Sequence, residues 1–234
     1  MSNARATKAT GKLTKPQDPL GDGGPPVSLF GKVYARCYDR FMDRIDWAGA
    51  AEHRRRLVEE AAGEVLEVGA GTGKNLPLYR AAERVVALDP DPAMRARALE
   101  VARETQVPVE VVDGDGMALP FGDASFDAVV FSLVLCTVPD MERALAEARR
   151  VLRPGGRFRF YEHVRAADPH LARWQDRLER PWGWIGRGCH PNRDTVAAVA
   201  ATGFNVISLE AFDFPAMPRI VRAHVIGIAE RPAA

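Results

Sequence analysis

Three glycines at alternate positions, Gly69, Gly71 and Gly73, follow directly after the apolar run Val65–Val68. Glycine lets the backbone turn sharply and lets a ligand approach the main chain where a Cβ atom would collide with it. Dinucleotide-binding proteins use a similar turn, but with the spacing Gly-x-Gly-x-x-Gly. Here the spacing is Gly-x-Gly-x-Gly, and the carboxylate of Glu67 just before it suits an ammonium group and not a pyrophosphate. The pattern favours S-adenosylmethionine, which has the ammonium and no phosphate; a turn that serves packing alone is the alternative.

Two further carboxylates, Asp89 and Asp115, follow the next two apolar runs. Asp89 comes about twenty residues after Gly69, where a carboxylate can accept hydrogen bonds from both ribose hydroxyls of an adenosine cofactor. Asp115 can accept a hydrogen bond from the adenine amino group, with Met117 packing on the ring. Each position also has an ordinary explanation, since Asp89 can cap a helix and Asp-Gly pairs such as Asp115-Gly116 are common in turns. Together with the glycine turn, they favour adenosine binding.

The spacing of apolar residues places these motifs on alternating strands and helices. The predicted strands are Val65–Val68, Arg84–Leu88, Val109–Val112, Ala128–Ser132 and Arg157–Tyr161, and the predicted helices are Phe30–Met42, Ala48–Ala62, Met141–Leu152 and Arg193–Ala201. We also expect a helix directly after the glycine turn, and another after Asp91, which is a fair N-cap with Pro92 in the first turn. This alternation implies right-handed crossovers and a mostly parallel sheet. No clear helix separates the last two strands, Asn205–Glu210 and His224–Ala229, which predicts an antiparallel hairpin at the sheet edge.

The order of the motifs resembles that of class I methyltransferases. The motifs are, in order, Glu67 to Gly73, Asp89, Gly114 to Phe121, Ser125-Phe126-Asp127 and Val151 to Gly156. The resemblance implies a Rossmann-like α/β fold: a seven-stranded, mostly parallel sheet with a reversed last strand and helices on both faces. It also implies S-adenosyl-L-methionine as methyl donor and S-adenosyl-L-homocysteine as product. The implied cofactor contacts are Tyr38, Glu67, Gly69, Gly71, Gly73, Asn75, Asp89, Pro90, Met94, Asp115, Gly116, Met117 and Ser132.

A narrower resemblance covers most of the chain from Tyr38 onward. It rests on Tyr38-Asp39-Arg40, Ser132 to Val138, Glu162-His163-Val164, Gly188-Cys189-His190 and Arg222 to Val225. These segments resemble the corresponding segments of the methyltransferase-like family whose animal members are alkyl-thiol S-methyltransferases. Ubiquinone and menaquinone C-methyltransferases resemble chiefly the cofactor half, about residues 64–161. The resemblance implies a small-molecule acceptor: a thiol, or else an oxygen, nitrogen or carbon atom of a quinone, phenol, lipid or natural product.

On the acceptor side, His163 follows the fifth predicted strand, where the pocket of such a sheet opens. It is our candidate for the catalytic base or thiol-orienting group, and a histidine hydrogen-bonded within the fold is the alternative. We expect no metal, because the adjacent Cys189 and His190 do not have the spacing of zinc ligands and no Cys-x-x-Cys is present. Cys136 is expected to be a small buried hydrophobe.

Two aromatic groups can cover the site. Trp174, Trp182 and Trp184 lie in a stretch, about residues 165–192, that we expect to be irregular and to act either as a cap over the acceptor or as a packed insertion. Tyr34 and Tyr38 can close over the cofactor from the N-terminal helix, or serve only to pack that helix against the sheet.

Length and composition predict one domain, residues 28–234. It follows an arm at residues 1–27 that is rich in Gly, Pro, Thr and Lys and is expected to be disordered.

The net charge of the chain is +1, which provides no electrostatic field to attract nucleic acid. The animal relatives carry a hydrophobic N-terminal anchor where this chain has the polar arm. The most apolar run, Ala128–Val138, is far shorter than the roughly 20 residues of a membrane helix. We therefore expect a cytoplasmic protein without stable membrane insertion, with its three cysteines reduced.

Two other functions fit the same kind of sheet. A short-chain nicotinamide-dependent oxidoreductase needs a Tyr-x-x-x-Lys pair, and no tyrosine of this chain has a lysine four residues later. A scaffold that kept the fold without the chemistry is the other alternative, because a fold does not dictate function. The retained carboxylates Glu67, Asp89 and Asp115 argue against it.

Overall fold

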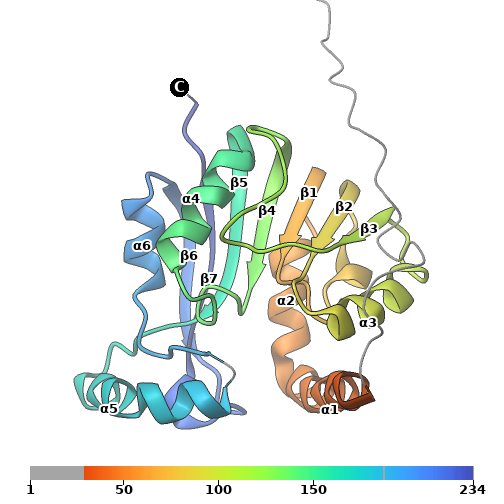
Figure 1. The fold of residues 1–234 in the computed structure, drawn as a ribbon. Coiled ribbons are helices and arrows are strands. Elements are labelled where there is room, and N and C mark those ends of the chain that lie inside the picture. Colours follow the sequence, from red (N-terminus) through yellow and green to blue (C-terminus); the bar gives the residue numbers. More distant parts are fainter. Residues whose placement is uncertain (1–28, 187, 234) are drawn as a thin grey trace, which may run out of the picture.

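The computed structural model describes residues 29–186 and 188–233, so the arm predicted at 1–27 lies outside the described residues. The described residues form one seven-stranded sheet with the order β3-β2-β1-β4-β5-β7-β6 (Figure 1). The strands are β1 Gly63–Val68, β2 Ala82–Leu88, β3 Val109–Val112, β4 Phe126–Ser132, β5 Leu152–His163, β6 Asn205–Asp213 and β7 Ala223–Glu230. The first five strands pair in parallel, and β7 runs antiparallel to both β5 and β6. The predicted sheet with a reversed last strand is confirmed.

Helices cover both faces of the sheet, as predicted (Figure 1). They are α1 Leu29–Ile45, α2 Ala51–Val58, α3 Pro92–Ala102, α4 Met141–Val151, α5 Pro169–Ile185 and α6 Thr195–Ala201. Successive residues of a strand point to opposite faces, so neighbouring side chains enter different cores. Leu66 and Val129 pack in the core that includes α4 and α6, whereas Val65 and Val130 pack in the core that includes α2 and α3. Continuous apolar strands are therefore buried on both sides, as a parallel sheet requires.

The start of α3 follows the sequence signals closely. The side chain of Asp91 accepts hydrogen bonds from the backbone N–H of Ala93 at 2.8 Å and of Met94 at 3.4 Å. Pro92 is the first helical residue, where its missing N–H costs nothing. The predicted cap is confirmed, and it places Met94 in the first turn, directly after the end of β2.

Two predicted elements differ from the structure. Instead of a helix after the glycine turn, the chain forms a single 3₁₀ turn, Leu76–Leu78, because Pro77 lacks a backbone donor and Tyr79 is extended. The stretch predicted to be irregular at 165–192 contains the seventeen-residue helix α5. Asp168 caps this helix by accepting from the N–H of His170 at 2.9 Å, and Pro181 lies within it.

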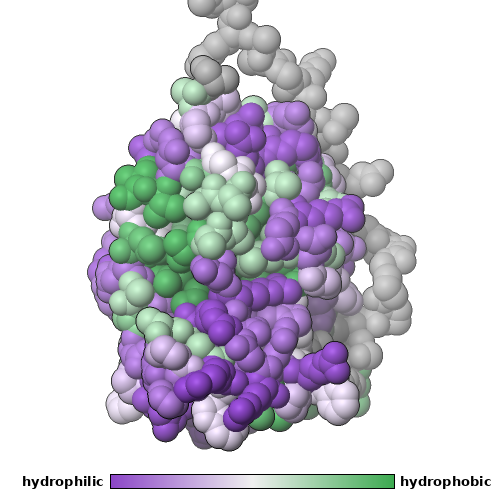
Figure 2. All heavy atoms as spheres, turned by 90° about the vertical axis from the view of Figure 1, so that its left-hand side faces the viewer, coloured by the Kyte–Doolittle hydropathy of each residue, from purple (hydrophilic) through white to green (hydrophobic). Residues whose placement is uncertain are grey.

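Strand β6 is the edge of the sheet at the side opposite β3. Figure 2 faces this side and shows apolar side chains gathered in one area of it. The exposed large apolar residues of β6 are Val206, Ile207 and Leu209. Among the described residues, no helix is both long and apolar enough to cross a membrane.

Candidate active site

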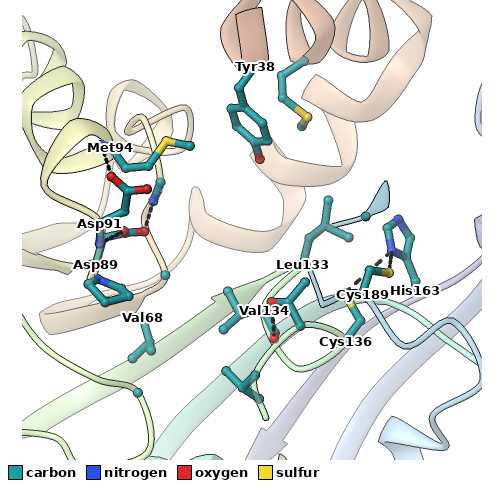
Figure 3. Close-up of a pocket in the computed structure, with 18 of the residues that line it drawn as sticks. Tyr38, Val68, Asp89, Asp91, Met94, Leu133, Val134, Cys136, His163 and Cys189 are labelled. Carbon is teal, nitrogen blue, oxygen red and sulfur yellow. Dashed lines mark hydrogen bonds between the residues drawn. The ribbon is translucent and has the colours of Figure 1, made fainter. Parts of the chain in front are cut away.

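A cavity of about 670 Å³ opens at the carboxyl ends of the central strands (Figure 3). Its wall includes Gly69 after β1, Asp89 after β2, Leu133 after β4 and His163 at the end of β5. The chain passes from β1 outward to β3 and then back to β4 on the other side of β1, and ligands bind at such a reversal of strand order. The volume of the cavity lies in the range of small-molecule binding sites.

The cavity brings together nine of the residues predicted from the sequence. Among the described residues that line it are Tyr38, Gly69, Gly71, Asp89, Pro90, Met94, Asp115, Gly116 and His163. Five other predicted contacts are not part of this lining: Glu67, Gly73, Asn75, Met117 and Ser132. The structure thus places nine of the predicted residues on the wall of this cavity and five outside it.

At one end of the cavity, Asp89 is held by two backbone donors. Its Oδ2 accepts from the N–H of Gly71 and its Oδ1 from the N–H of Asp91, both at 2.8 Å. Each carboxylate oxygen keeps lone-pair capacity for a further donor, such as a ribose hydroxyl. Burial raises the pKa of Asp89, which is 7 % exposed. Gly71 has a φ of +57°, and a Cβ atom there would meet no atom within 4 Å, so its Hα faces open space.

Glu67 lies behind the glycine turn and is 1 % exposed. Its two carboxylate oxygens accept hydrogen bonds from Asn75 Nδ2 at 2.7 Å and from the Tyr79 hydroxyl at 2.9 Å. Burial raises the pKa of Glu67 to about 7. The hydrogen bond between Glu67 and Asn75 connects the end of β1 to the segment after the glycine turn, and so it fixes the backbone path of the turn.

Helix α1 forms one wall of the cavity, and Figure 3 shows Tyr38 pointing from this helix into the pocket. Tyr34 and Tyr38 both line the cavity and also pack against Ala35 and Met94. Burial raises the pKa of Tyr38 to about 12, which keeps its hydroxyl protonated. Helix α1 is held to α3 by an ion pair between Asp39 and Arg97 at 3.1 Å.

At the other end, a tight turn follows β4. Leu133 has a φ of +59°, a conformation that non-glycine residues adopt rarely and that clusters at functional sites. The carboxylate of Glu162 accepts from three successive backbone N–H groups, those of Val134 and Leu135 at 2.9 Å and of Cys136 at 3.2 Å. Burial raises the pKa of Glu162 to about 7. This buried carboxylate, which sequence reasoning missed, fixes the wall of the cavity beside His163.

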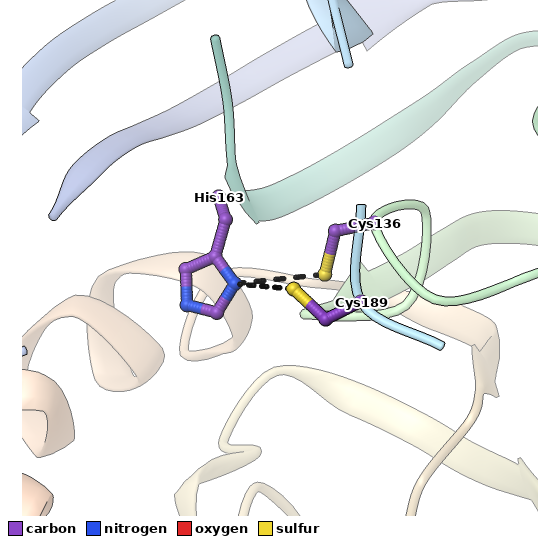
Figure 4. A group of neighbouring side chains, drawn as sticks. All are labelled: Cys136, His163 and Cys189. Carbon is purple, nitrogen blue, oxygen red and sulfur yellow. Dashed lines mark hydrogen bonds between the residues drawn. The ribbon is translucent and has the colours of Figure 1, made fainter. Parts of the chain in front are cut away.

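Three side chains from separate segments meet at this end (Figure 4). His163 Nδ1 lies 3.7 Å from Cys136 Sγ and 3.6 Å from Cys189 Sγ, and all three residues are buried. The neighbouring His190 is not part of this group, since its Nδ1 lies 2.8 Å from Glu179 Oε1. The predicted burial of Cys136 is confirmed. The neighbouring Cys136 and His163 lower the pKa of Cys189, while the pKa of Cys136 is raised well above its usual value.

Helix α5 contributes to the wall of the cavity near this group of side chains. Trp182 and Ile185 line the cavity, whereas Trp174 and Trp184 are 55 % and 90 % exposed. Among the three tryptophans considered from the sequence, Trp182 is thus the one placed to contact a ligand.

The strand order, the reversed β7, the glycine turn after β1 and the acid after β2 define a class I S-adenosylmethionine-dependent methyltransferase. Residues 66–160 match the family model of a methyltransferase domain. The thiol S-methyltransferase TMT1A of Homo sapiens is 36 % identical over 192 residues, which cover 76 % of this chain and 78 % of that protein. The chain belongs to the methyltransferase family that contains these thiol S-methyltransferases.

Other relatives agree with this class. A demethylmenaquinone methyltransferase of Thermobifida fusca is 37 % identical over 180 residues, covering 70 % of this chain and 75 % of that protein. A solved S-adenosylmethionine-dependent methyltransferase of Thermotoga maritima shares the fold with a TM-score of 0.63 at 21 % identity, over 86 % of this chain and 97 % of that one. The protein is an S-adenosylmethionine-dependent methyltransferase, and the oxidoreductase and scaffold alternatives are set aside.

Proposed function

We propose that this enzyme transfers the methyl group of S-adenosylmethionine to the sulfur atom of a small thiol. One observation carries the proposal: a single cavity has Asp89 at one end and the buried sulfur and imidazole groups of Cys136, His163 and Cys189 at the other. The first end suits the ribose of the cofactor, and the second suits a soft, polarizable acceptor. The thiol S-methyltransferases among the relatives support this choice.

The lining residues suggest how the cofactor lies. The ribose hydroxyls bind Asp89, the adenine lies beside Met94, Asp115 and Gly116, and the methionine part lies along Gly69 and Gly71. Pro90 completes the wall near the ribose, and Tyr38 closes over it from α1. Glu67, Gly73 and Asn75 support the turn from behind, and Met117 and Ser132 lie outside the wall. S-adenosyl-L-homocysteine leaves from the same position.

The reaction makes modest demands on the protein. The acceptor attacks the methyl carbon in line with the bond to the sulfonium, so the protein must chiefly position the acceptor and exclude water. A thiol with a pKa near 8.5 ionises with little help. His163 lines the cavity, and its buried Nε2 has no hydrogen-bond partner among the described side chains and backbone. His163 is our candidate for the group that orients the thiol or takes its proton.

A second candidate reaction is C-methylation of a quinone. The demethylmenaquinone methyltransferases among the relatives favour it, as does the apolar character of Leu133, Val138, Ile185 and Met217 in the wall of the cavity. A quinone ring would pack against these side chains and would not need the sulfur groups.

A panel of alkyl thiols, phenols, amines and quinones tests the proposal. Each compound is incubated with enzyme and S-adenosylmethionine, and the product is read by mass spectrometry as the gain of one methyl group. We expect methylation of thiols, and we expect the Asp89→Ala variant to lose most of that activity because it binds the cofactor weakly. Methylation of quinones or phenols without methylation of any thiol contradicts the thiol proposal and leaves the methyltransferase assignment intact.

A further inference from the structure

The group of Cys136, His163 and Cys189 has the composition and the size of a metal site. The two Sγ atoms and the imidazole nitrogen all lie within 4.8 Å of one another (Figure 4). Two cysteines and one histidine form a ligand set typical of zinc. The residues come from the turn after β4, the end of β5 and the segment after α5, so the fold alone brings them together.

The distances fit tetrahedral coordination. Zinc binds a cysteine sulfur at about 2.3 Å and a histidine nitrogen at about 2.0–2.1 Å. At a tetrahedral angle these bond lengths separate the nitrogen from each sulfur by roughly 3.6 Å. The distances from His163 Nδ1 to the two sulfurs are 3.7 Å and 3.6 Å. One ion placed among the three atoms therefore needs little movement of the side chains.

We propose that Cys136, His163 and Cys189 bind one thiophilic divalent metal ion, such as Zn²⁺, whose fourth coordination position faces the cavity and receives the sulfur of the acceptor. Three protein ligands with one open position are the arrangement of catalytic zinc sites, whereas structural sites have four protein ligands. All three residues line the cavity that also contains Asp89, so the open position faces the space in which the acceptor must lie. The sequence predicted no metal because the three ligands have no recognisable spacing.

The surroundings hold the ligands in place before any ion binds. The backbone N–H of His190 donates to the carbonyl oxygen of Cys136 at 2.6 Å, which ties the two cysteine-bearing segments together. Glu162 accepts from the N–H of Cys136 at 3.2 Å and from the two residues before it. Hydrogen bonds around the ligands commonly orient them and strengthen metal binding. These hydrogen bonds hold the segments that carry Cys136 and Cys189 beside His163.

The metal would activate the thiol directly, and this part of the inference rests on the proposed function. The acceptor thiol gives its proton to water as its sulfur binds the ion, and His163 then orients the thiol through the metal instead of taking its proton. The metal-bound sulfur then forms a bond to the methyl carbon while the bond from that carbon to the cofactor's sulfur breaks. The products are S-adenosyl-L-homocysteine and a neutral thioether, which is a weaker ligand than the thiolate and leaves. Two cysteine thiolates balance the charge of the divalent ion before the acceptor binds, and the positive charge of the cofactor's sulfonium offsets that of the bound acceptor thiolate.

Metal binding is tested on the full chain, kept reduced and freed of metal by a chelator. Titration with Co²⁺ should give one equivalent of binding, with the intense visible bands of tetrahedral cobalt and the thiolate charge-transfer band in the near ultraviolet. Zn²⁺ should displace the cobalt and abolish these bands. The variants Cys136→Ser, Cys189→Ser and His163→Ala should each weaken binding by about 100-fold or more, because each removes one of three ligands.

The third cysteine provides the matched control. Cys37 lies on α1 and is exposed, so Cys37→Ser should bind Co²⁺ like the wild type. Calorimetric affinity for S-adenosylmethionine checks that each ligand variant is folded. The proposal is overturned if the wild type gives no tetrahedral spectrum, or if Cys37→Ser weakens binding as much as Cys136→Ser.

The thiol panel separates this inference from the proposed function. Loss of thiol methylation on metal removal, restored by one equivalent of Zn²⁺, supports both. Thiol methylation at an unchanged rate in the metal-free protein overturns the role of the metal in binding the acceptor and keeps the thiol proposal. A bound metal in an enzyme that methylates quinones and no thiol supports the site and overturns the thiol proposal.

Discussion

The backbone N–H of Gly71 donates a hydrogen bond of 2.8 Å to Oδ2 of Asp89, so the glycine turn after β1 and the carboxylate after β2 form one unit. The carboxylate is fixed in the wall of the cavity by the same turn along which we place the methionine part of the cofactor. Its other oxygen accepts from the N–H of Asp91. Because the carboxylate oxygens of Asp89 are held in place before the cofactor arrives, little side-chain entropy is lost when they accept hydrogen bonds from the ribose.

We expect the Asp89→Ala variant to bind S-adenosylmethionine more weakly by about 1–3 kcal/mol, since it loses charge-assisted hydrogen bonds to the ribose. Isothermal titration calorimetry measures this directly. Asp89→Asn keeps the shape and one acceptor oxygen, and its loss should be smaller than that of the alanine variant. Unchanged affinity in a folded Asp89→Ala protein would remove the ribose role from this residue.

Gly71 and Gly155 form a matched pair for testing the glycine turn. Both have a positive φ, +57° and +77°, and an added Cβ atom would meet nothing within 4 Å at either position. Alanine at either position should therefore cost a similar amount of stability, about 1 kcal/mol, from the left-handed backbone. Only Gly71 lines the cavity, so Gly71→Ala should weaken cofactor binding about tenfold or more while Gly155→Ala leaves it unchanged. Equal affinities in the two variants would mean that the glycine serves the backbone alone.

The sequence predicts the sheet well because each strand is a continuous apolar run that ends at a turn signal. Val109–Val112 has the predicted bounds, and the antiparallel pairing of β7 follows from the missing crossover helix before it. Helix α5 was missed because Pro181 and Gly183 are typical of loops. The helix forms nonetheless: its Gln175 is buried and bonds to the backbone at Val164 and Ala166, so tertiary contacts outweigh local propensity.

That the residues at the Asp89 end line one cavity could be predicted from the sequence, because they follow successive strands at fixed distances. The grouping of side chains at the other end could not. Cys136, His163 and Cys189 are separated by 27 and 26 residues and meet only because β4 and β5 are neighbours and the segment after α5 returns to them. The positive φ of Leu133 and the three N–H groups bound by Glu162 carry no sequence signal, because leucine and glutamate are ordinary residues in strands and turns.

Glu67 should make the stability of the protein depend on pH. Its pKa is raised by burial from 4.5 to about 7, so between these values the folded protein keeps a proton that the unfolded chain releases. The free energy of unfolding therefore falls as pH rises through this window, by on the order of 3 kcal/mol for this group. Glutamine at this position does not titrate. Urea unfolding at pH 5 and pH 8 should show a smaller fall for Glu67→Gln than for the wild type; an equal fall in both would contradict the raised pKa.

The ion pair between Asp39 and Arg97 should control how long the cofactor stays bound. The pair joins α1 to α3 at 3.1 Å, and Tyr38, the neighbour of Asp39, projects from α1 into the cavity. Helix α1 forms part of the wall of the cavity, so we expect a weaker hold on it to speed release of the cofactor more than it slows entry. Partly exposed ion pairs are worth roughly 0.2–1 kcal/mol, which corresponds to an increase in the release rate of up to about fivefold for Asp39→Ala. Stopped-flow displacement of bound S-adenosyl-L-homocysteine measures that rate.

The Arg157→Ala variant serves as the control. It removes a comparable ion pair, between Arg157 and Glu230 at 2.7 Å, that is not part of the cavity wall. If the pair acts as a unit, Asp39→Ala, Arg97→Ala and the double variant should release the product at similar rates. A release rate in Asp39→Ala that matches the Arg157→Ala control would show that packing of α1 on Met94 holds the helix without the ion pair.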